Sequence, residues 1–117
     1  MLTPREKSAL KKYIDESDDR LHTIFDALGE QNRCNMFRLF IKNTSLNVGE
    51  IADLLDITVP LASQHLKVLE HLSVVERNKI GREVFYKINE QDPVVRSIIS
   101  SVLEAKQEEQ HETKHTS

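Results

Sequence analysis

The chain has 117 residues, 38% of them hydrophobic and 30% charged, which suits one soluble domain with a thin core. No apolar run approaches the roughly 20 residues that cross a bilayer, so a membrane span is excluded. The single cysteine excludes an internal disulfide, and the 5% share of aromatic residues argues against binding nucleic acid by base stacking. The net charge of −3 excludes a uniformly basic nucleic-acid binder, and residues 1–12 lack the apolar core of a secretory signal, so a cytoplasmic protein is expected.

Two helical segments are expected in the first quarter of the chain. Residues 1–17 mix charged residues with a few apolar ones and predict an N-terminal arm or a short helix. Residues 18–28 carry apolar residues at helical spacing, and Gly29 follows them as a stop signal. These apolar residues are Leu21, Ile24, Phe25 and Leu28.

The next two helices are expected over residues 30–42 and about 48–55. The first is apolar over a wide arc and contains Cys34, which we expect to act as a small buried hydrophobic residue. Asn47 and Glu50 have the three-residue spacing of a capping box, with Asn in the usual Ser or Thr position. They mark the start of the second helix.

The stretch TVPLASQHLKVLEH, residues 58–71, predicts a helix with two unlike faces. The Thr58 hydroxyl is placed to cap the Leu61 N–H, and Pro60 falls in the first turn, where its missing N–H is tolerated. The apolar face has Ala62, Leu66 and Leu69 at its centre and Leu61, Val68 and Leu72 along one side. The opposite face carries Pro60, Ser63, Gln64, Lys67 and His71. His65 lies at the flank, where we expect a packing role, with a phosphate contact as the alternative.

A change from helical to alternating periodicity predicts a β-hairpin after this helix. Strands are expected at about residues 75–79 and 83–88, on either side of a turn at Gly81. Three basic residues belong to the hairpin, with Arg77 and Lys79 on one face of the first strand and Arg82 at the tip.

The last expected helix begins at Asp92-Pro93, a good pair for the N-cap and the first helical position. A doubled apolar stripe follows, made of Val94, Val95, Ile98, Ile99, Val102 and Leu103. The sequence becomes polar from Gln107, and a frayed end is expected there. The predicted organisation is an arm over residues 1–17, a domain over 18–107 and a polar tail over 108–117.

Two short helices joined by a tight turn and followed by a hairpin predict a winged helix-turn-helix in a mainly α fold. The charge distribution agrees, because residues 58–87 hold five basic and three acidic residues whereas the rest of the chain holds 11 and 16. A local basic patch on an acidic body attracts phosphates. We therefore expect the polar face of the helix over 58–71 in a DNA major groove, with the hairpin on phosphates or in the minor groove.

The segments FDALGEQNRCNMFRLF and VGEIADLLDITVPLASQHLKVLEHLSVVERNKIGREVFYKI resemble the ArsR/SmtB family of winged-helix regulators, from about Leu21 to Asn89. The resemblance implies a cytoplasmic homodimeric repressor that binds a palindromic operator on double-stranded DNA and is released by an inducer. Together with the helix and hairpin faces, it predicts DNA contacts at Val48, Thr58, Val59, Pro60, Ser63, Gln64, Lys67, Arg77, Lys79 and Arg82. The family often has a polar residue at Val59, so the operator sequence does not transfer.

The resemblance also implies a dimer interface built from the helices at the two ends of the domain. The expected contacts are Leu21, Ile24, Phe25 and Leu28 from the first, and Val94, Val95, Ile98, Ile99, Val102 and Leu103 from the last.

No cofactor is expected, and no sequence motif of an enzyme is present. One metal site of the family uses Cys-x-Cys at the start of the first helix of the helix-turn-helix, where this chain has Asn47 and Gly49. His111 and His115, four residues apart, remain weak candidates for holding Zn²⁺ or Ni²⁺. The alternative function is a protein-interaction adaptor that uses a winged helix without specific DNA binding.

Overall fold

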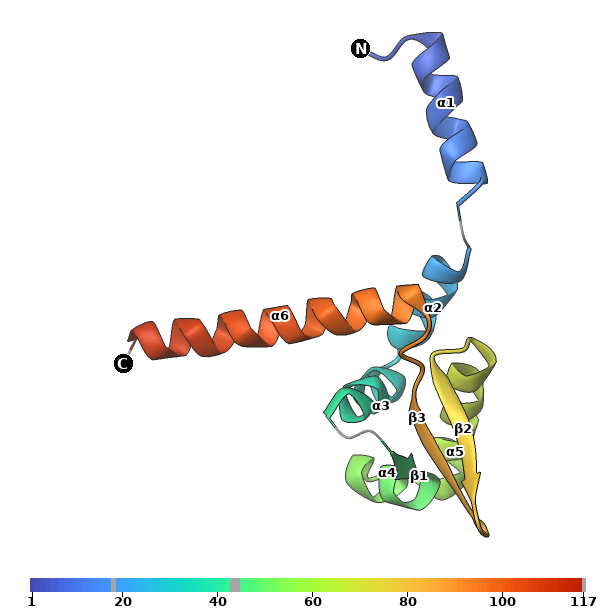
Figure 1. Cartoon of the computed structure of the whole chain (residues 1–117), viewed down its shortest axis with the longest axis vertical. Helices are drawn as coiled ribbons and strands as arrows, with labels where there is room; N and C mark the ends of the chain where they lie inside the picture. Colours follow the sequence, from blue (N-terminus) through green and yellow to red (C-terminus); the bar gives the residue numbers. More distant parts are fainter. Residues whose placement is uncertain (18, 43–44, 117) are drawn as a thin grey trace.

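A compact body of helices and a small sheet carries two long projecting helices, α1 (Pro4–Asp15) and α6 (Pro93–Thr116), which point away from it in different directions (Figure 1). The computed structural model describes residues 1–17, 19–42 and 45–116, with side chains described as far as residue 105. The radius of gyration is 18.2 Å, against about 13 Å for a compact chain of this length. The two projecting helices account for the difference.

Helix α1 forms although none of its residues is buried. The Thr3 side chain accepts a hydrogen bond from the Glu6 N–H at 3.1 Å, and the Glu6 carboxylate accepts one from the Thr3 N–H at 3.2 Å. This capping box satisfies two free donors at the helix start. The predicted arm or short helix is therefore a locally stabilised helix, whose apolar residues Leu10, Tyr13 and Ile14 are exposed.

Helices α2 (Arg20–Leu28) and α3 (Gln31–Lys42) supply one side of the core. Ile24 of α2 and Met36 of α3 are fully buried, as the helical spacing of apolar residues requires. Gly29 ends α2 with a φ of −72°, in the right-handed region, so it is not the left-handed cap that a terminal glycine often provides.

Helices α4 (Val48–Leu55) and α5 (Val59–His71) form the helix-turn-helix. The predicted capping box is confirmed, with Glu50 N–H to Asn47 Oδ1 at 2.8 Å and Asn47 N–H to Glu50 Oε1 at 2.9 Å. Asp56 adopts a left-handed φ of 55° between the helices, a conformation that aspartate tolerates better than most residues. This residue makes the tight turn that the sequence predicted only in outline.

The sheet has the strand order β1-β3-β2 and is antiparallel throughout. Strands β2 (Val75–Ile80) and β3 (Glu83–Ile88) are the predicted hairpin, and Gly81 has a φ of +65° at the first loop position. Strand β1 (Leu46–Asn47) was not predicted, because two residues are too few to show an alternating pattern. It pairs Leu46 with Tyr86 and joins the start of α4 to the sheet.

Helix α6 starts where the sequence predicted, with Asp92 Oδ1 accepting from the N–H groups of Val94 at 2.9 Å and Val95 at 3.2 Å. It runs to Thr116, so the backbone of 108–116 continues the helix through the polar segment for which the sequence predicted a frayed end. This segment lacks proline and glycine, and five of its nine residues are Glu, Gln or Lys, which favour helix without an apolar stripe.

The hydrophobic core lies where α2, α3, α4, α5 and the sheet meet, and it also takes the first turns of α6. Its largest fully buried side chains are Phe40, Ile24, Met36, Ile51, Leu66, Leu69, Val74, Val75 and Val95, the last two with relative exposures of 2% and 0%. Among the helices of the described residues, none combines the length and the apolar character that crossing a bilayer demands.

The Asp92 side chain, which is only 7% exposed, forms an ion pair with the Arg20 side chain, which is 42% exposed. This pair ties the start of α2 to the start of α6. Burial of the Asp92 carboxyl raises its pKa, but the hydrogen bond and charge of Arg20 and the bonds from the Val95 and Val94 N–H groups outweigh this, so the pKa lies below its ordinary value. A second bond, from Arg20 Nη2 to the Leu72 carbonyl at 3.4 Å, brings the end of α5 into the same junction.

Because the folded-state pKa of Asp92 is depressed, its contribution to stability is complete above the unfolded value of about 3.9 and is lost as pH falls through the folded value. Asp92→Asn keeps the capping oxygen but removes the charge. We expect it to lower the free energy of unfolding at pH 7 by about 1–2 kcal/mol and to flatten the acid limb of the stability curve. Urea unfolding at pH 7, 5 and 3 measures both, with the exposed Asp53→Asn as control. An acid limb identical to that of the wild type would contradict the assignment.

Candidate nucleic-acid interface

The first turn of helix α5 is exposed to solvent, and Thr58 caps its start. The Thr58 backbone is extended, with φ −72° and ψ 153°, and its hydroxyl accepts from the Leu61 N–H at 3.3 Å. Pro60 occupies the first turn, where no backbone donor is needed. The N-terminal end of α5 is therefore rigid, and its side chains Val59 and Pro60 are exposed.

The two faces of α5 differ as the periodicity predicted. Ala62, Leu66 and Leu69 each have a relative exposure of 0%, whereas Gln64 and Lys67 are exposed and Ser63 is half-buried. The apolar arc is narrower than predicted, because Leu61 and Val68 are each 37% exposed and so lie at its margin. One side of the helix is held by the core, and the other is free to contact a ligand.

The wing carries its basic residues on two faces and at its tip. Alternate residues of a strand share a face, so Val75, Arg77 and Lys79 lie on the same face of β2. Because Val75 is buried, this is the face of the sheet that is turned toward the body. Arg82 follows Gly81 in the exposed turn. Ile80, just before the turn, is 57% exposed.

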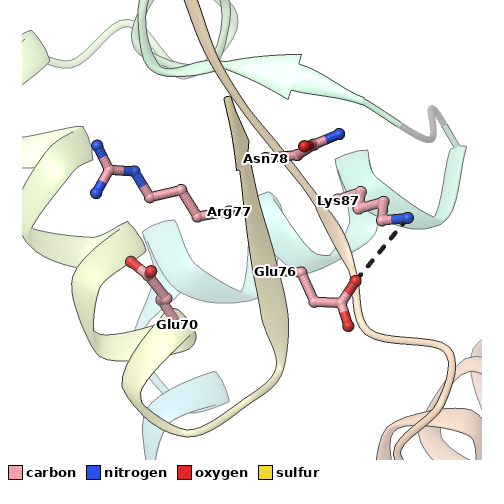
Figure 2. Close-up of a pocket in the computed structure, with 5 residues that line it drawn as sticks. All are labelled: Glu70, Glu76, Arg77, Asn78 and Lys87. Carbon is pink, nitrogen blue, oxygen red and sulfur yellow. Dashed lines mark ion pairs between the residues drawn. The ribbon is translucent and has the colours of Figure 1, made fainter. Parts of the chain in front are cut away.

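An open hollow beside β2 is lined by two acidic and two basic side chains and by Asn78. Figure 2 shows Arg77 directed to the side of β2 on which Glu70 of α5 lies, and Glu76 and Lys87 on the other side. Glu76 and Lys87 are opposite each other in the register and form an ion pair of 3.9 Å. The charge of Lys87 is thus partly neutralised, whereas the Arg77 side chain lies on the side of β2 that faces α5 (Figure 2).

Val48, the remaining predicted DNA contact, is the first residue of α4 and is half-buried against the core. The ten residues predicted to contact DNA therefore come from three places, the start of α4, the exposed side of α5 and the wing. Leu54 of α4, which the helical spacing over about 48–55 predicts to be buried, is instead 58% exposed. Its position in an apolar periodic run concealed this exposure.

Two residues predicted at the dimer interface belong instead to the core of the single subunit. Ile24 and Val95 each have a relative exposure of 0%, so neither offers a surface to a second chain. Helical spacing identifies the apolar side of a helix, but it does not say whether that side is covered by the same subunit or by a second one. Of the others, Leu21, Phe25 and Leu103 are exposed at 48%, 55% and 45%, and Leu28, Val94, Ile98, Ile99 and Val102 are partly buried.

A contact that the sequence did not reveal joins α5 to the start of α3. The His65 ring lies 3.1 Å from the Arg33 guanidinium and 3.7 Å from the Glu30 carboxylate. His65 was predicted to pack at the flank of the core, and its side chain is indeed only 12% exposed. Its two polar partners lie more than 30 residues away, so no local pattern could identify them.

Within the described part of the chain, no group of three or more His, Cys, Asp or Glu side chains is arranged to hold a metal ion. The side chains of His111 and His115 lie outside the described residues. Cys34 is half-buried on α3, as a small apolar residue can be.

Comparison with known proteins identifies the family. The family described as "Bacterial regulatory protein, arsR family" matches residues 30–77. The cadmium resistance transcriptional regulatory protein CadC of Listeria innocua is 32% identical over 84 residues, which are 72% of this chain and 68% of CadC. These matches include the helix-turn-helix and the start of the wing.

Solved structures share the same fold. The transcriptional repressor PagR of Bacillus anthracis has a TM-score of 0.63 and 27% identity, over 72% of this chain and 93% of PagR. Reduced HlyU of Vibrio cholerae has a TM-score of 0.68 and 22% identity, over 78% and 93% of the two chains. The protein therefore belongs to the ArsR family of bacterial regulatory proteins, and it is a DNA-binding winged helix-turn-helix transcriptional regulator rather than an enzyme.

Proposed function

We propose that the protein is a homodimeric repressor, which binds a palindromic operator in the cytoplasm and is released by an inducer. The observation that carries this proposal is the exposed polar side of α5, with Gln64 and Lys67 free beside a wing that bears Arg77 and Arg82. A major groove admits a helix of this kind, and phosphates lie within reach of a wing on the same side. An adaptor role has no comparable support, since the relatives are regulators of transcription.

Base reading is assigned to the first two turns of α5. Gln64 carries an amide that can pair with both polar groups on the major-groove edge of adenine. Val59 is 49% exposed and can contact only apolar groups, of which the thymine methyl is the one that the major groove offers. Lys67 and the wing residues Arg77, Lys79 and Arg82 supply phosphate contacts, which position the helix without reading sequence.

Dimerisation is assigned to the exposed apolar residues of α2 and α6. Leu21 and Phe25 on α2 and Leu103 on α6 are large, apolar and about half exposed in the single subunit. Together with the partly buried residues of α6, they can bury enough apolar surface to contribute several kcal/mol at about 25 cal/mol per Å². A second subunit is the natural cover, because the operators of helix-turn-helix dimers repeat the two-fold symmetry of the protein.

The inducer is proposed to act without the thiolate metal site known in the family. The two positions of that site are Asn47 and Gly49. Asn47 already uses its side chain to cap α4, with a bond of 2.8 Å from the Glu50 N–H, and Gly49 has no side chain to offer. A soft metal would find no sulfur ligand there.

We expect Gln64 and Arg82 to contribute to DNA binding in different ways. Gln64→Ala should weaken binding to a duplex selected from a random library by about 1–3 kcal/mol while leaving binding to scrambled DNA nearly unchanged. Arg82→Ala should weaken both duplexes alike and lower the salt slope by about 1. Fluorescence anisotropy over a range of salt concentrations measures both effects. An equal loss on the two duplexes for Gln64→Ala would remove Gln64 from base reading.

The contact of Val59 can be tested by removing a single methyl group from the DNA. Replacing each thymine of the selected half-site in turn by uracil should reveal a position where wild-type affinity falls by about threefold, the effect of losing one partly buried methyl. Val59→Ala should bind the thymine and uracil duplexes equally at that position. If every uracil duplex binds the wild type as tightly as its parent, Val59 does not contact a thymine methyl.

Phe25 and Val95 separate the dimer surface from the subunit core. Phe25→Asp should give a folded monomer, with the helical circular dichroism retained and the sedimentation coefficient reduced. Val95→Ala should keep the dimer but lower the free energy of unfolding by about 2 kcal/mol, because it opens a cavity in the core. Sedimentation velocity and urea unfolding of both variants decide the matter. A Phe25→Asp protein that still sediments as the wild type does would place the interface elsewhere.

A further inference from the structure

His65 is placed on α5 between the side held by the core and the side offered to DNA. The His65 side chain is only 12% exposed, whereas Gln64, the residue before it, is exposed to solvent. Instead, ring atom Nδ1 lies 3.1 Å from Nη1 of Arg33, and Nε2 lies 3.7 Å from Oε2 of Glu30. Glu30 directly precedes α3 and Arg33 lies in its first turn, so the His65 ring connects α5, the proposed recognition helix, to the start of α3.

The direction of the hydrogen bond follows from the chemistry of the two groups. A guanidinium only donates, so Nδ1 of His65 must accept from Nη1 of Arg33. The tautomer that allows this bond carries its hydrogen on Nε2, the atom that faces the Glu30 carboxylate. The bond to a charged donor is stronger than one between neutral groups.

Arg33 continues the connection to α2. Its Nε donates to the Ala27 carbonyl at 2.7 Å, in the last turn of α2, where Ala27 is 4% exposed. Its own backbone N–H is held by Glu30 Oε2 at 2.9 Å. One side chain therefore joins the end of α2 to the flank of α5 by two successive hydrogen bonds, and Glu30 holds the start of α3 in place beside them.

Apolar packing determines which side of α5 faces the core, but it does not by itself fix the fine rotation of the helix about its axis. Ala62, Leu66 and Leu69 hold the helix in the core through contacts that are non-directional. A hydrogen bond, by contrast, weakens steeply as its angle departs from linear. The Arg33–His65 bond is therefore a directional constraint in the flank of α5, and it is anchored on α2, the helix that carries Leu21 and Phe25.

We infer that Arg33 and His65 are positioning residues, which fix the orientation of the recognition helix relative to α2 and thereby the spacing of the two recognition helices on DNA. The inference rests on the proposed homodimeric repressor. Helix-turn-helix dimers bind half-sites about 34–36 Å apart, so a loosened α5 still reaches one half-site but places the second one less accurately. The consequence is a loss of selectivity for half-site spacing rather than a general loss of DNA binding.

The test uses a duplex that the wild-type protein selects from a random library, a second duplex with one base pair inserted between the half-sites, and a third with a single half-site. The wild type should prefer the selected spacing strongly over the altered one. His65→Leu should reduce this preference about tenfold, equivalent to about 1.4 kcal/mol. Its affinity for the single half-site should stay within about twofold of the wild type.

His65→Asn provides the matched rescue, because its Oδ1 takes the place of Nδ1, at the same distance along the side chain, and can accept from Arg33. It should restore the spacing preference. His71→Leu, which removes an exposed imidazole from the end of the same helix, should leave the preference unchanged. Circular dichroism melting of each variant checks that the domain is folded.

Arg33→Lys gives an independent variant if His65→Leu fails to fold. Lysine keeps the positive charge, but its single ammonium cannot reproduce the forked geometry that serves Ala27 and His65 together. It should also reduce the spacing preference about tenfold. Folded variants that retain the wild-type preference, or that lose single half-site and full-site binding equally, overturn the inference. Failure of the wild type to dimerise or to select any duplex would instead overturn the proposed function.

Discussion

The burial of one side of α5 is the interaction on which the rest of the structure depends. Ala62, Leu66 and Leu69 are fully enclosed by residues from α3, α4 and the sheet, and the helix cannot turn that side outward without exposing the centre of the core. The other side must then be presented to solvent. A helix that is thus buried on one side and exposed on the other, next to a wing, is what the contact with a DNA groove needs.

Polar contacts add the direction that hydrophobic packing lacks. Asn47 and Glu50 fix the start of α4, Thr58 fixes the start of α5, and Arg20 with Asp92 joins α2 to α6. Each lies at the end of a helix, where backbone groups would otherwise remain unsatisfied. The caps therefore fix where α4 and α5 begin, and the Arg20–Asp92 pair adds a directional link between two helices.

The two projecting helices add little to the hydrophobic core of the single subunit. The residues of α6 that bear on the core are confined to its first turns, and α1 has no buried residue at all. A chain of this size can build a core of its own, but a thin one, and a second subunit can add to the apolar surface that it buries. The exposed apolar residues of α2 and α6 are consistent with a fold that is completed by a second subunit, as we propose. The negative charge of the body outside residues 58–87 disfavours DNA contact by any other surface.

The sequence by itself determined the helices from residue 18 onward, the caps at the starts of α4, α5 and α6, and the hairpin. Each depends on neighbours within one or two turns, such as Asn47 with Glu50, Thr58 with Leu61, and the glycine at 81 with its positive φ. It also determined the family, because the motif across the helix-turn-helix and wing is continuous in the chain. The tertiary structure alone decided which apolar residues are enclosed, so Ile24 and Val95 moved from the predicted dimer surface to the core.

The same holds for the polar junctions. Arg20 with Asp92, and Arg33 with His65, are separated by 72 and 32 residues, and each residue taken alone is only a charged or polar side chain on a helix. Local periodicity reports the side on which a residue lies, because that side is fixed by the backbone geometry of its own helix. It does not report the partner, because the partner is chosen by how distant elements pack together.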